Sequence, residues 1–194
     1  MGDVARIRLV NYDDMDNGYK KLLREASRMT DGWWHQGGYP NHFRLEANSP
    51  LYKLIWKAEK TLWNGIGNIT PELMGYIFYA VSTVNGSSYC TGAACSIFSS
   101  MNVLDMIGST SSKSPKFSRL STKEKAAVQF ALKSLENPHS VNDRDIKRMK
   151  QSGFTDADLL NIVHAIDVVS FSNRANIIFR TEYDHKFPSK DIPI

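Results

Sequence analysis

The chain has 194 residues, of which 42% are hydrophobic and 23% charged, and its formal net charge at pH 7 is +4. This length suits one domain with a sizeable core, and no low-complexity tract suggests a disordered chain. Because no apolar run reaches the ~18 residues of a membrane span, and because the basic residues are interspersed with acidic ones, we expect neither a membrane protein nor a nucleic-acid-binding protein.

The N-terminal part of the chain predicts helices separated by short loops. The first ten residues suit a short strand or an extended arm, and apolar residues at helical spacing then predict a helix from Asp14 to about Met29. Asn41 precedes a short helix predicted over His42–Ala47, and Ser49-Pro50 starts another that ends near Gly65. This last helix should bury an apolar face made of Leu51, Leu54, Ile55, Ala58 and Leu62.

An unusually aromatic loop, Asp31–Pro40, follows the first of these helices. Its glycines and proline break regular structure, and it contains the adjacent pair Trp33-Trp34. Two adjacent Trp residues in a loop suit packing across a cleft or a subunit interface, because each can bury a large area. They suit equally a role in covering the core of the domain itself, and the sequence leaves both interpretations open.

The middle of the chain predicts a helix, a tight turn and a second helix. Thr70-Pro71 is a helix start, and the helix should run to Val84. Asn85-Gly86 ends it, and the side-chain oxygen of Ser87 or Ser88 can cap the next helix. The inward-facing residues of the first helix should be Leu73, Met74, Ile77, Phe78 and Val81.

The C-terminal part of the chain predicts three further helices. A brief helical piece around Val103–Ile107 and a serine-rich polar loop over 108–119 lead to a capping box, Ser121-Thr122-Lys123-Glu124. Asn142 should cap the next helix, and Thr155 should start a final long one. Since no pair of strands with a hairpin turn is visible, the sequence predicts an all-α fold of about eight helices packed in antiparallel pairs.

The two cysteines, Cys90 and Cys95, are too few for a disulfide framework, and the N-terminus lacks an apolar signal segment, so we expect a reducing, cytoplasmic location. Cys90 should lie in the first turn of the helix after Ser87, where free backbone N–H groups and the helix dipole stabilise a thiolate. Such a cysteine can be a nucleophile or redox centre, or an ordinary buried thiol. A five-residue spacing is ~7.5 Å of helical rise, beyond the ~7 Å limit for a disulfide, so Cys95 should be a small buried residue.

Two segments carry a pattern that occurs in the same order in a known protein family. The first runs from Ala80 to Cys90 and is similar to that family's segment AVSxxNGCxYC. The second lies in the C-terminal half and matches through Leu120-Ser121, Glu124, Ala127, Asp143, Gly153-Phe154, Asp156, Phe171 and Asn173-Arg174. On these residues the chain resembles the carboxymuconolactone decarboxylase/AhpD-like family, in its peroxidase-related branch.

The resemblance implies a single AhpD-like domain over residues 1–194, with a core at about 49–179, an N-terminal helical extension and a C-terminal arm. It also implies a homo-oligomer that associates through helical faces. In AhpD-type members of the family, a CxxC pair stands at a helix start. Its second Cys attacks a peroxide, its first Cys resolves the sulfenic acid into a disulfide, and a Glu and a His relay protons.

Position by position, this chain keeps only the attacking cysteine of that site, as Cys90. Ser87 stands where the first Cys would be, Ala94 where the His would be and Gly75 where the Glu would be. The resemblance therefore implies peroxiredoxin- or alkylhydroperoxidase-type antioxidant activity through Cys90 alone, in which a peroxide oxidises the thiol and an external thiol reductant restores it. Ser87 would hydrogen-bond the thiolate, and no cofactor or metal is implied, since no phosphate loop, dinucleotide fingerprint or metal-ligand spacing is visible.

Two other interpretations stay open. His164, Asp167 and Ser170 lie on neighbouring turns of the final helix, where His164 and Asp167 suit an acid–base pair for a cysteine-independent reaction. The same residues suit a buried pair that only links helices. Alternatively, the protein is a catalytically inactive relative that acts as an oligomeric scaffold or binding module, through the former active-site pocket and the Trp33-Trp34 loop.

Overall fold

The computed structural model describes residues 5–29, 39–100 and 120–184, and in these ranges all regular secondary structure is helical. The short turns Tyr12–Asp14 and Pro138–Ser140 are 3-10 helices. The described residues form eight α-helices: α1 Asn17–Met29, α2 Asn41–Glu46, α3 Tyr52–Trp63, α4 Pro71–Val84, α5 Ser88–Ser100, α6 Thr122–Glu136, α7 Asp143–Gln151 and α8 Asp156–Ile178. The prediction of an all-α fold with about eight helices is confirmed.

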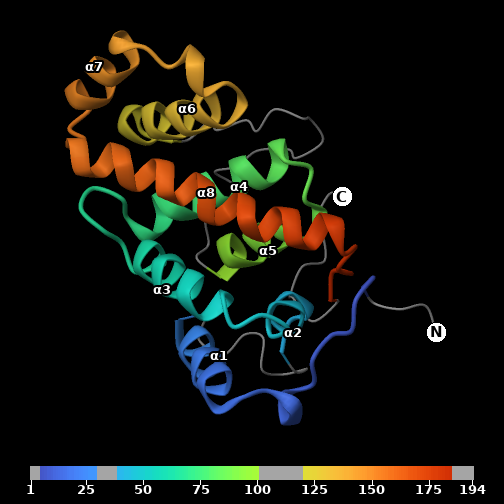
Figure 1. The fold of residues 1–194 in the computed structure, drawn as a ribbon. Coiled ribbons are helices and arrows are strands. Elements are labelled where there is room, and N and C mark those ends of the chain that lie inside the picture. The colour runs from blue at the N-terminus through green and yellow to red at the C-terminus, as the bar shows by residue number, and fades with distance from the viewer. Residues whose placement is uncertain (1–4, 30–38, 101–119, 185–194) are drawn as a thin grey trace.

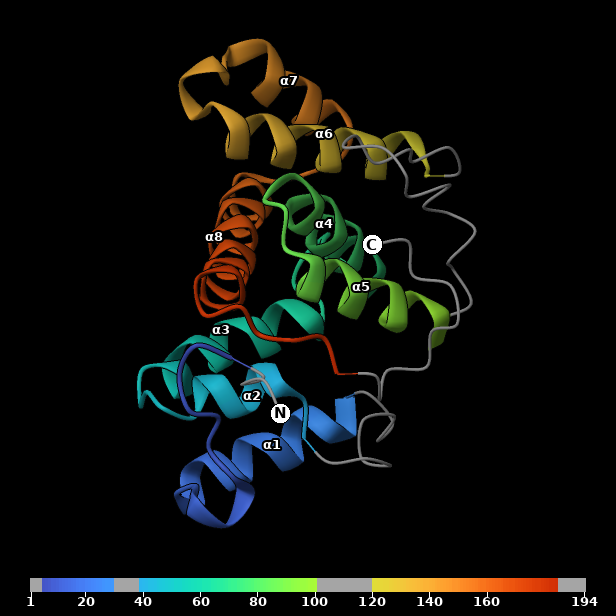
Figure 2. The same cartoon turned by 90° about the vertical axis from the view of Figure 1, so that its right-hand side faces the viewer.

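Helix α4 lies at the centre of the molecule and contacts α3, α5, α6 and α8 (Figures 1 and 2). Helices α6 and α7 lie at one end of the molecule and α1 lies at the other. The largest core cluster is built mainly from α4, α5, α6 and α8. The inward face predicted for α4 is confirmed, since all five of its residues are buried: Leu73, Met74, Ile77, Phe78 and Val81.

A second apolar cluster joins α1 to α3 at the other end of the molecule. It contains Tyr19 and Leu23 of α1 together with Tyr52 and Trp56 of α3. Since α3 also contacts α8, it connects this cluster to the part of the molecule that contains Cys90. The N-terminal helices are therefore positioned to contribute side chains near Cys90.

The start predicted at Ser49-Pro50 is not confirmed, because α3 begins at Tyr52 and has no side-chain cap. The helix starts predicted for α4 and for α5 to α8 are confirmed. Each capping side chain accepts a backbone N–H of the first turn at 3.0–3.2 Å. At α5 the Ser87 Oγ accepts the N–H of Cys90 at 3.4 Å, so Cys90 lies in the first turn as expected. The other caps are Thr70 on α4, Ser121 on α6, Asn142 on α7 and Thr155 on α8.

The buried face predicted for α3 is confirmed at Leu62 but is wrong over most of the helix. Leu51 and Leu54 are 53% and 62% exposed, whereas Tyr52 and Trp56 are buried. A shift of one position along a helix rotates the face by ~100°. The aromatic side chains occupy the inner face because α1 supplies an apolar surface on which they pack, and this surface is not visible in the sequence of α3 itself.

Smaller differences concern the ends of elements. Helix α1 begins at Asn17, three residues after the predicted start, and Pro40 rather than Asn41 precedes α2. Residues 5–10 form no strand. The predictions for Trp33-Trp34, for residues 101–119 and for the tail beyond 184 lie outside the described residues. Among the described helices, none combines the length and apolar character that crossing a membrane requires.

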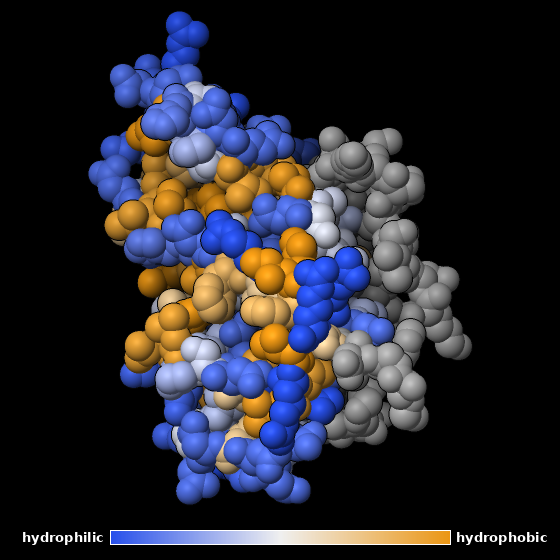
Figure 3. All heavy atoms as spheres, turned by 45° about the vertical axis from the view of Figure 1, so that its right-hand side comes forward, coloured by the Kyte–Doolittle hydropathy of each residue, from blue (hydrophilic) through white to orange (hydrophobic). Residues whose placement is uncertain are grey.

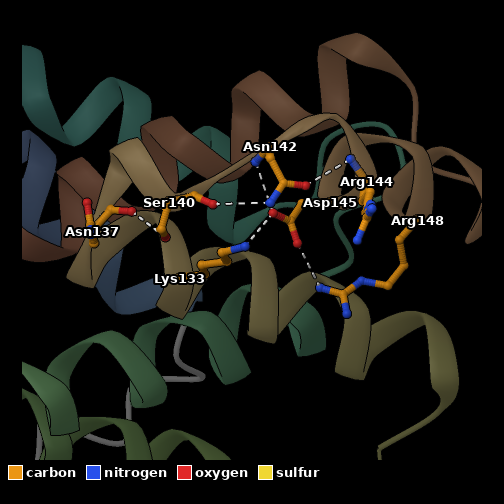
Figure 4. A network of polar contacts seen from close by, with 7 residues as sticks. All are labelled: Lys133, Asn137, Ser140, Asn142, Arg144, Asp145 and Arg148. Carbon is orange, nitrogen blue, oxygen red and sulfur yellow. Dashed lines mark hydrogen bonds and ion pairs between the residues drawn. The ribbon is translucent and has the colours of Figure 1, made fainter.

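The end of the molecule formed by α6 and α7 is held by a polar network around Asp145 (Figure 4). Its carboxylate accepts hydrogen bonds from Lys133 of α6, from Arg148 of α7 and from the backbone N–H of Asn142. The lysine hydrogen bond, followed by the backbone one, holds the pKa of Asp145 below its usual range. This network therefore stabilises a charged carboxylate with cationic partners.

A buried polar cluster around Cys90 as the candidate functional site

Cys90 is positioned by the turn between α4 and α5. Gly86 takes a left-handed conformation with φ of 73°, and the Ser87 N–H donates to the carbonyl of Ser82 at 2.9 Å. Ser87 then caps α5 through the N–H of Cys90. Both Ser87 and Cys90 are buried, so the structure brings these two predicted site residues together.

The surroundings of Cys90 favour the protonated form of its thiol. Burial raises its pKa, and hydrogen bonds with Ser87, Asn173 and Asn176 offset this only in part. The expectation of a thiolate stabilised by the helix start is therefore wrong. A helix N-terminus contributes at most about 2 kcal/mol to an anion, and the loss of water around a buried charge costs several kcal/mol.

Cys95 lies buried in the main core, as predicted from its spacing. Burial raises the pKa of its thiol to about 11. Both cysteines are free thiols. Among the described residues, a side chain donates a hydrogen bond to the sulfur of Cys90 but not to that of Cys95. The donor is Asn176 Nδ2, which lies 3.4 Å from Cys90 Sγ.

Asn176 of α8 connects Cys90 to His42 of α2. Its Nδ2 lies 2.9 Å from the carbonyl oxygen of Ser172 and 3.0 Å from His42 Nδ1. A carbonyl oxygen can only accept, so the amide nitrogen must face Ser172. His42 Nδ1 is then an acceptor without a proton, and the proton of the neutral ring is on Nε2.

The chain of hydrogen bonds continues from His42 into α3. His42 Nε2 lies 3.3 Å from the hydroxyl of Tyr52, and that hydroxyl donates to Glu59 Oε2 at 2.9 Å. Tyr52 is fully buried and Glu59 partly so. A continuous polar path thus runs from the Cys90 sulfur through Asn176, His42 and Tyr52 to a carboxylate.

This cluster shifts titratable groups toward their neutral forms. Burial lowers the pKa of His42 to about 4 and raises that of Glu59 to about 7. Glu46 of α2 also has a pKa raised to about 7, by burial and by the nearby charge of Glu59. Within the described residues, neither glutamate has a Lys or Arg within ion-pair distance, so no opposite charge offsets the cost of burying their charge.

The end of the described chain fixes α2 over α5. The hydroxyl of Tyr89 accepts the backbone N–H of His42 at 3.1 Å and donates to Asp184 at 3.0 Å. The other oxygen of Asp184 accepts the N–H of Asn41 at 2.6 Å. Because these bonds join three separate segments, the position of the His42 ring relative to Cys90 depends on all of them.

His164 and Asp167 are both exposed on α8. Among the described residues neither side chain makes a hydrogen bond or ion pair, whereas the hydroxyl of buried Ser170 accepts a hydrogen bond from Asn85 at 3.3 Å. The structure therefore joins Ser170, but not His164 or Asp167, to the interior of the bundle.

The sequence reasoning missed His42, Tyr52, Glu59 and Asn176. One local signal was available, because Tyr52 and Glu59 are seven residues apart and so share one face of α3. The links from Asn176 to Cys90 and to His42 join residues 86 and 134 positions apart in the chain, and no local pattern indicates them. In the described part of the chain, no group of three or more His, Cys, Asp or Glu residues is arranged to hold a metal ion.

Comparison by sequence alone identifies no relative. No protein-family model matches the chain, and no curated protein matches it significantly. Solved structures do resemble it. An uncharacterized peroxidase-related protein from Ralstonia eutropha, described as an alkylhydroperoxidase AhpD core, matches with a TM-score of 0.75 and 20% identity over 96% of both chains.

Two further structures cover nearly the whole chain. An uncharacterized peroxidase-related protein from Silicibacter matches with a TM-score of 0.76 and 16% identity, over 96% of this chain and 95% of that one. The debrominase Bmp8, solved in complex with 2,3,4-tribromopyrrole, matches with a TM-score of 0.66 and 16% identity, over 96% and 94%. At these identities the similarity is one of fold. The chain has the AhpD-like fold of peroxidase-related proteins.

Proposed function

We propose that the protein reduces peroxides through Cys90 in a one-cysteine cycle, with an external thiol as reductant. The observation that carries the proposal is the buried polar environment of Sγ, which accepts a hydrogen bond from Asn176. The carbonyl oxygen of the same amide is buried and has no hydrogen-bond partner among the described residues. The hydroxyl of a bound substrate, or of a sulfenic acid formed on Cys90, could donate a hydrogen bond to this unpaired carbonyl oxygen.

The reaction balances without a cofactor. Cys90 sulfur attacks the terminal oxygen of a hydroperoxide, the S–O bond forms and the O–O bond breaks. The sulfur is oxidised to a sulfenic acid by two electrons, and the peroxide leaves as an alcohol after taking up the proton of the thiol. Two molecules of an external thiol then reduce the sulfenic acid to the thiol, with release of water and a disulfide.

The depth of Cys90 favours a small substrate. Because Cys90 is only 3% exposed, hydrogen peroxide should react faster than a bulky organic hydroperoxide. The two peroxidase-related neighbours support the choice of reaction, and the debrominase shows that the fold also serves a different substrate. The free state of both cysteines suits the cytoplasmic location that we expect.

The test is peroxide consumption by the purified protein with dithiothreitol as reductant. Cys90→Ala should abolish turnover, and the matched change Cys95→Ser should leave it intact, since Cys95 lies in the core outside the polar cluster. Turnover that survives in Cys90→Ala but is lost in His164→Ala would instead support the cysteine-independent reaction with His164 and Asp167. Absence of turnover with any peroxide would support the scaffold interpretation.

We also propose that the protein is a homo-oligomer, as the family resemblance implies. Two apolar residues at opposite ends of α8, Leu160 and Ile178, are 56% and 53% exposed. Figure 3 shows hydrophobic side chains gathered across the middle of one face, with hydrophilic ones around them. Burial of such surface would stabilise association, and the mass measured by light scattering tests it.

A further inference from the structure

We propose that His42, Tyr52 and Glu59 form a proton relay for Cys90, which removes the thiol proton during attack on the peroxide and returns it to the leaving oxygen. The inference rests on the proposed function of Cys90. The proton relay that the family resemblance implies would use positions occupied here by Gly75 and Ala94, neither of which can carry a proton. The relay proposed here comes from different elements, α2 and α3.

The direction of each hydrogen bond permits proton transfer. His42 Nδ1 carries no proton, since its lone pair accepts from Asn176, and its Nε2–H points to the Tyr52 hydroxyl. A peroxide hydroxyl that replaces the Asn176 N–H at Nδ1 would make this lone pair available to a proton. When Nδ1 takes up a proton, Nε2 can pass its own proton to Tyr52. The hydroxyl proton of Tyr52 then moves to Glu59. The His42 ring gains a proton at Nδ1 and loses one at Nε2, and the Tyr52 oxygen gains one and loses one, so the net result is a protonated Glu59.

The substrate completes the path between Cys90 and His42. Asn176 Nδ2 contacts both Cys90 Sγ and His42 Nδ1, so the two atoms lie around one amide nitrogen. The Asn176 amide cannot carry the proton, because an amide N–H does not gain and lose protons as an imidazole does. The hydroxyl of a bound hydroperoxide that bridges Cys90 Sγ and His42 Nδ1 would carry it. The thiol proton then reaches His42 through that hydroxyl, and the return path delivers a proton to the alkoxide when the O–O bond breaks.

The chemistry of the end groups suits this role. A group is an effective proton acceptor near the pH at which it titrates, and burial places the pKa of Glu59 at about 7. Glu59 is partly exposed, so it can exchange its proton with solvent between turnovers. The other titratable groups packed around the relay are Tyr19 on α1, Glu46 on α2, Tyr89 and Cys90 on α5, and Asp184.

The experiment measures, across a range of pH, the rate at which hydrogen peroxide converts Cys90 to a sulfenic acid in the Cys95→Ser protein. Dimedone traps the sulfenic acid, and mass spectrometry measures the trapped product. The rate should rise with pH through about 7, because only ionised Glu59 accepts a proton. Tyr52→Phe should slow the reaction about 10²-fold and remove this rise, since a ring without a hydroxyl cannot pass a proton. Glu59→Gln, which keeps an acceptor for Tyr52 but no basic oxygen, should have the same effect.

Tyr19→Phe is the matched control. Tyr19 is a buried tyrosine of the same aromatic cluster, and its hydroxyl donates to the carbonyl of Phe43 at 2.8 Å, outside the relay. Its loss should leave the rate and its pH dependence unchanged. Normal rates and pH profiles in both folded Tyr52→Phe and Glu59→Gln would overturn the relay and leave Cys90 as the reactive thiol. A wild-type Cys90 that forms no sulfenic acid would instead overturn the proposed function.

Discussion

The protein contains two polar networks that treat a carboxylate in opposite ways. Between α6 and α7, Asp145 accepts hydrogen bonds from a lysine and an arginine, and its pKa is lowered (Figure 4). In the Cys90 cluster, Glu59 accepts a hydrogen bond from neutral Tyr52, and its pKa is raised to about 7. Cationic partners keep the Asp145 carboxylate charged, whereas Glu59, which has no such partner, has a pKa close to neutral pH.

The network around Asp145 suits a role in stability, and the cluster around Cys90 suits a role in chemistry. Ionised Asp145 is matched to fixed partners, and no change of charge near pH 7 is expected there. The Cys90 cluster keeps a thiol, an imidazole and a carboxylate that titrate at shifted pH values, which is costly and is typical of functional sites.

The largest expected effect comes from removing the centre of the buried network. Asn176→Ala should lower the free energy of unfolding by about 3 kcal/mol, because it removes the buried amide that donates to His42 Nδ1 and to Cys90 Sγ and leaves a cavity between them. The comparison is Arg148→Ala, which removes a partly exposed partner of Asp145 and should cost less than about 1 kcal/mol. Urea denaturation measures both, and equal losses would contradict the distinction between the networks.

The second effect is a difference in the pH dependence of stability. The pKa of Glu46 is raised in the folded state, so its contribution is fully present below its unfolded value and is lost as pH rises through about 7. Glu46→Gln removes this loss. From about pH 5 to about pH 8 the variant should gain up to about 2 kcal/mol relative to the wild type.

Asp145→Asn should show the opposite sign. Because the pKa of Asp145 is lowered, its contribution is present at neutral pH and is lost as pH falls through its folded value. The variant should therefore be destabilised at neutral pH and approach the wild type in acid. Thermal denaturation at several pH values tests both substitutions, and parallel pH profiles would contradict the assignment.

The smallest effect is that of salt. Screening weakens pairs between exposed charges, so 1 M NaCl should reduce the stability difference between wild type and Arg148→Ala. The cost of Asn176→Ala should not change with salt, since its partners are buried and uncharged at neutral pH. A matching salt dependence for both variants would argue against this distinction.

The fold was largely predictable because its signals are local. Caps such as Thr70 and Ser121 act within one turn, and the apolar pattern of α4 lies within one helix. The placement of Ser87 and Cys90 at the start of α5 was predicted in the same way. The inner face of α3 was mispredicted because it depends on α1, and the sequence of α3 offers apolar residues on both sides.

The remainder of the site depends on contacts between distant segments. His42 meets Asn176 across 134 positions, and Cys90 meets Asn176 across 86. The pKa of Cys90 was predicted with the wrong sign for the same reason, because burial by other helices outweighs the local effect of the helix start. For His164 and Asp167, spacing placed them together on α8 but did not show that both side chains are exposed.

The most direct test of the central claim is the second-order rate constant of Cys90 with hydrogen peroxide, measured in the Cys95→Ser protein beside free cysteine at the same pH. We expect a larger constant for Cys90, although burial raises the pKa of its thiol, because the surrounding groups take up and return the proton. A constant no greater than that of free cysteine would contradict it.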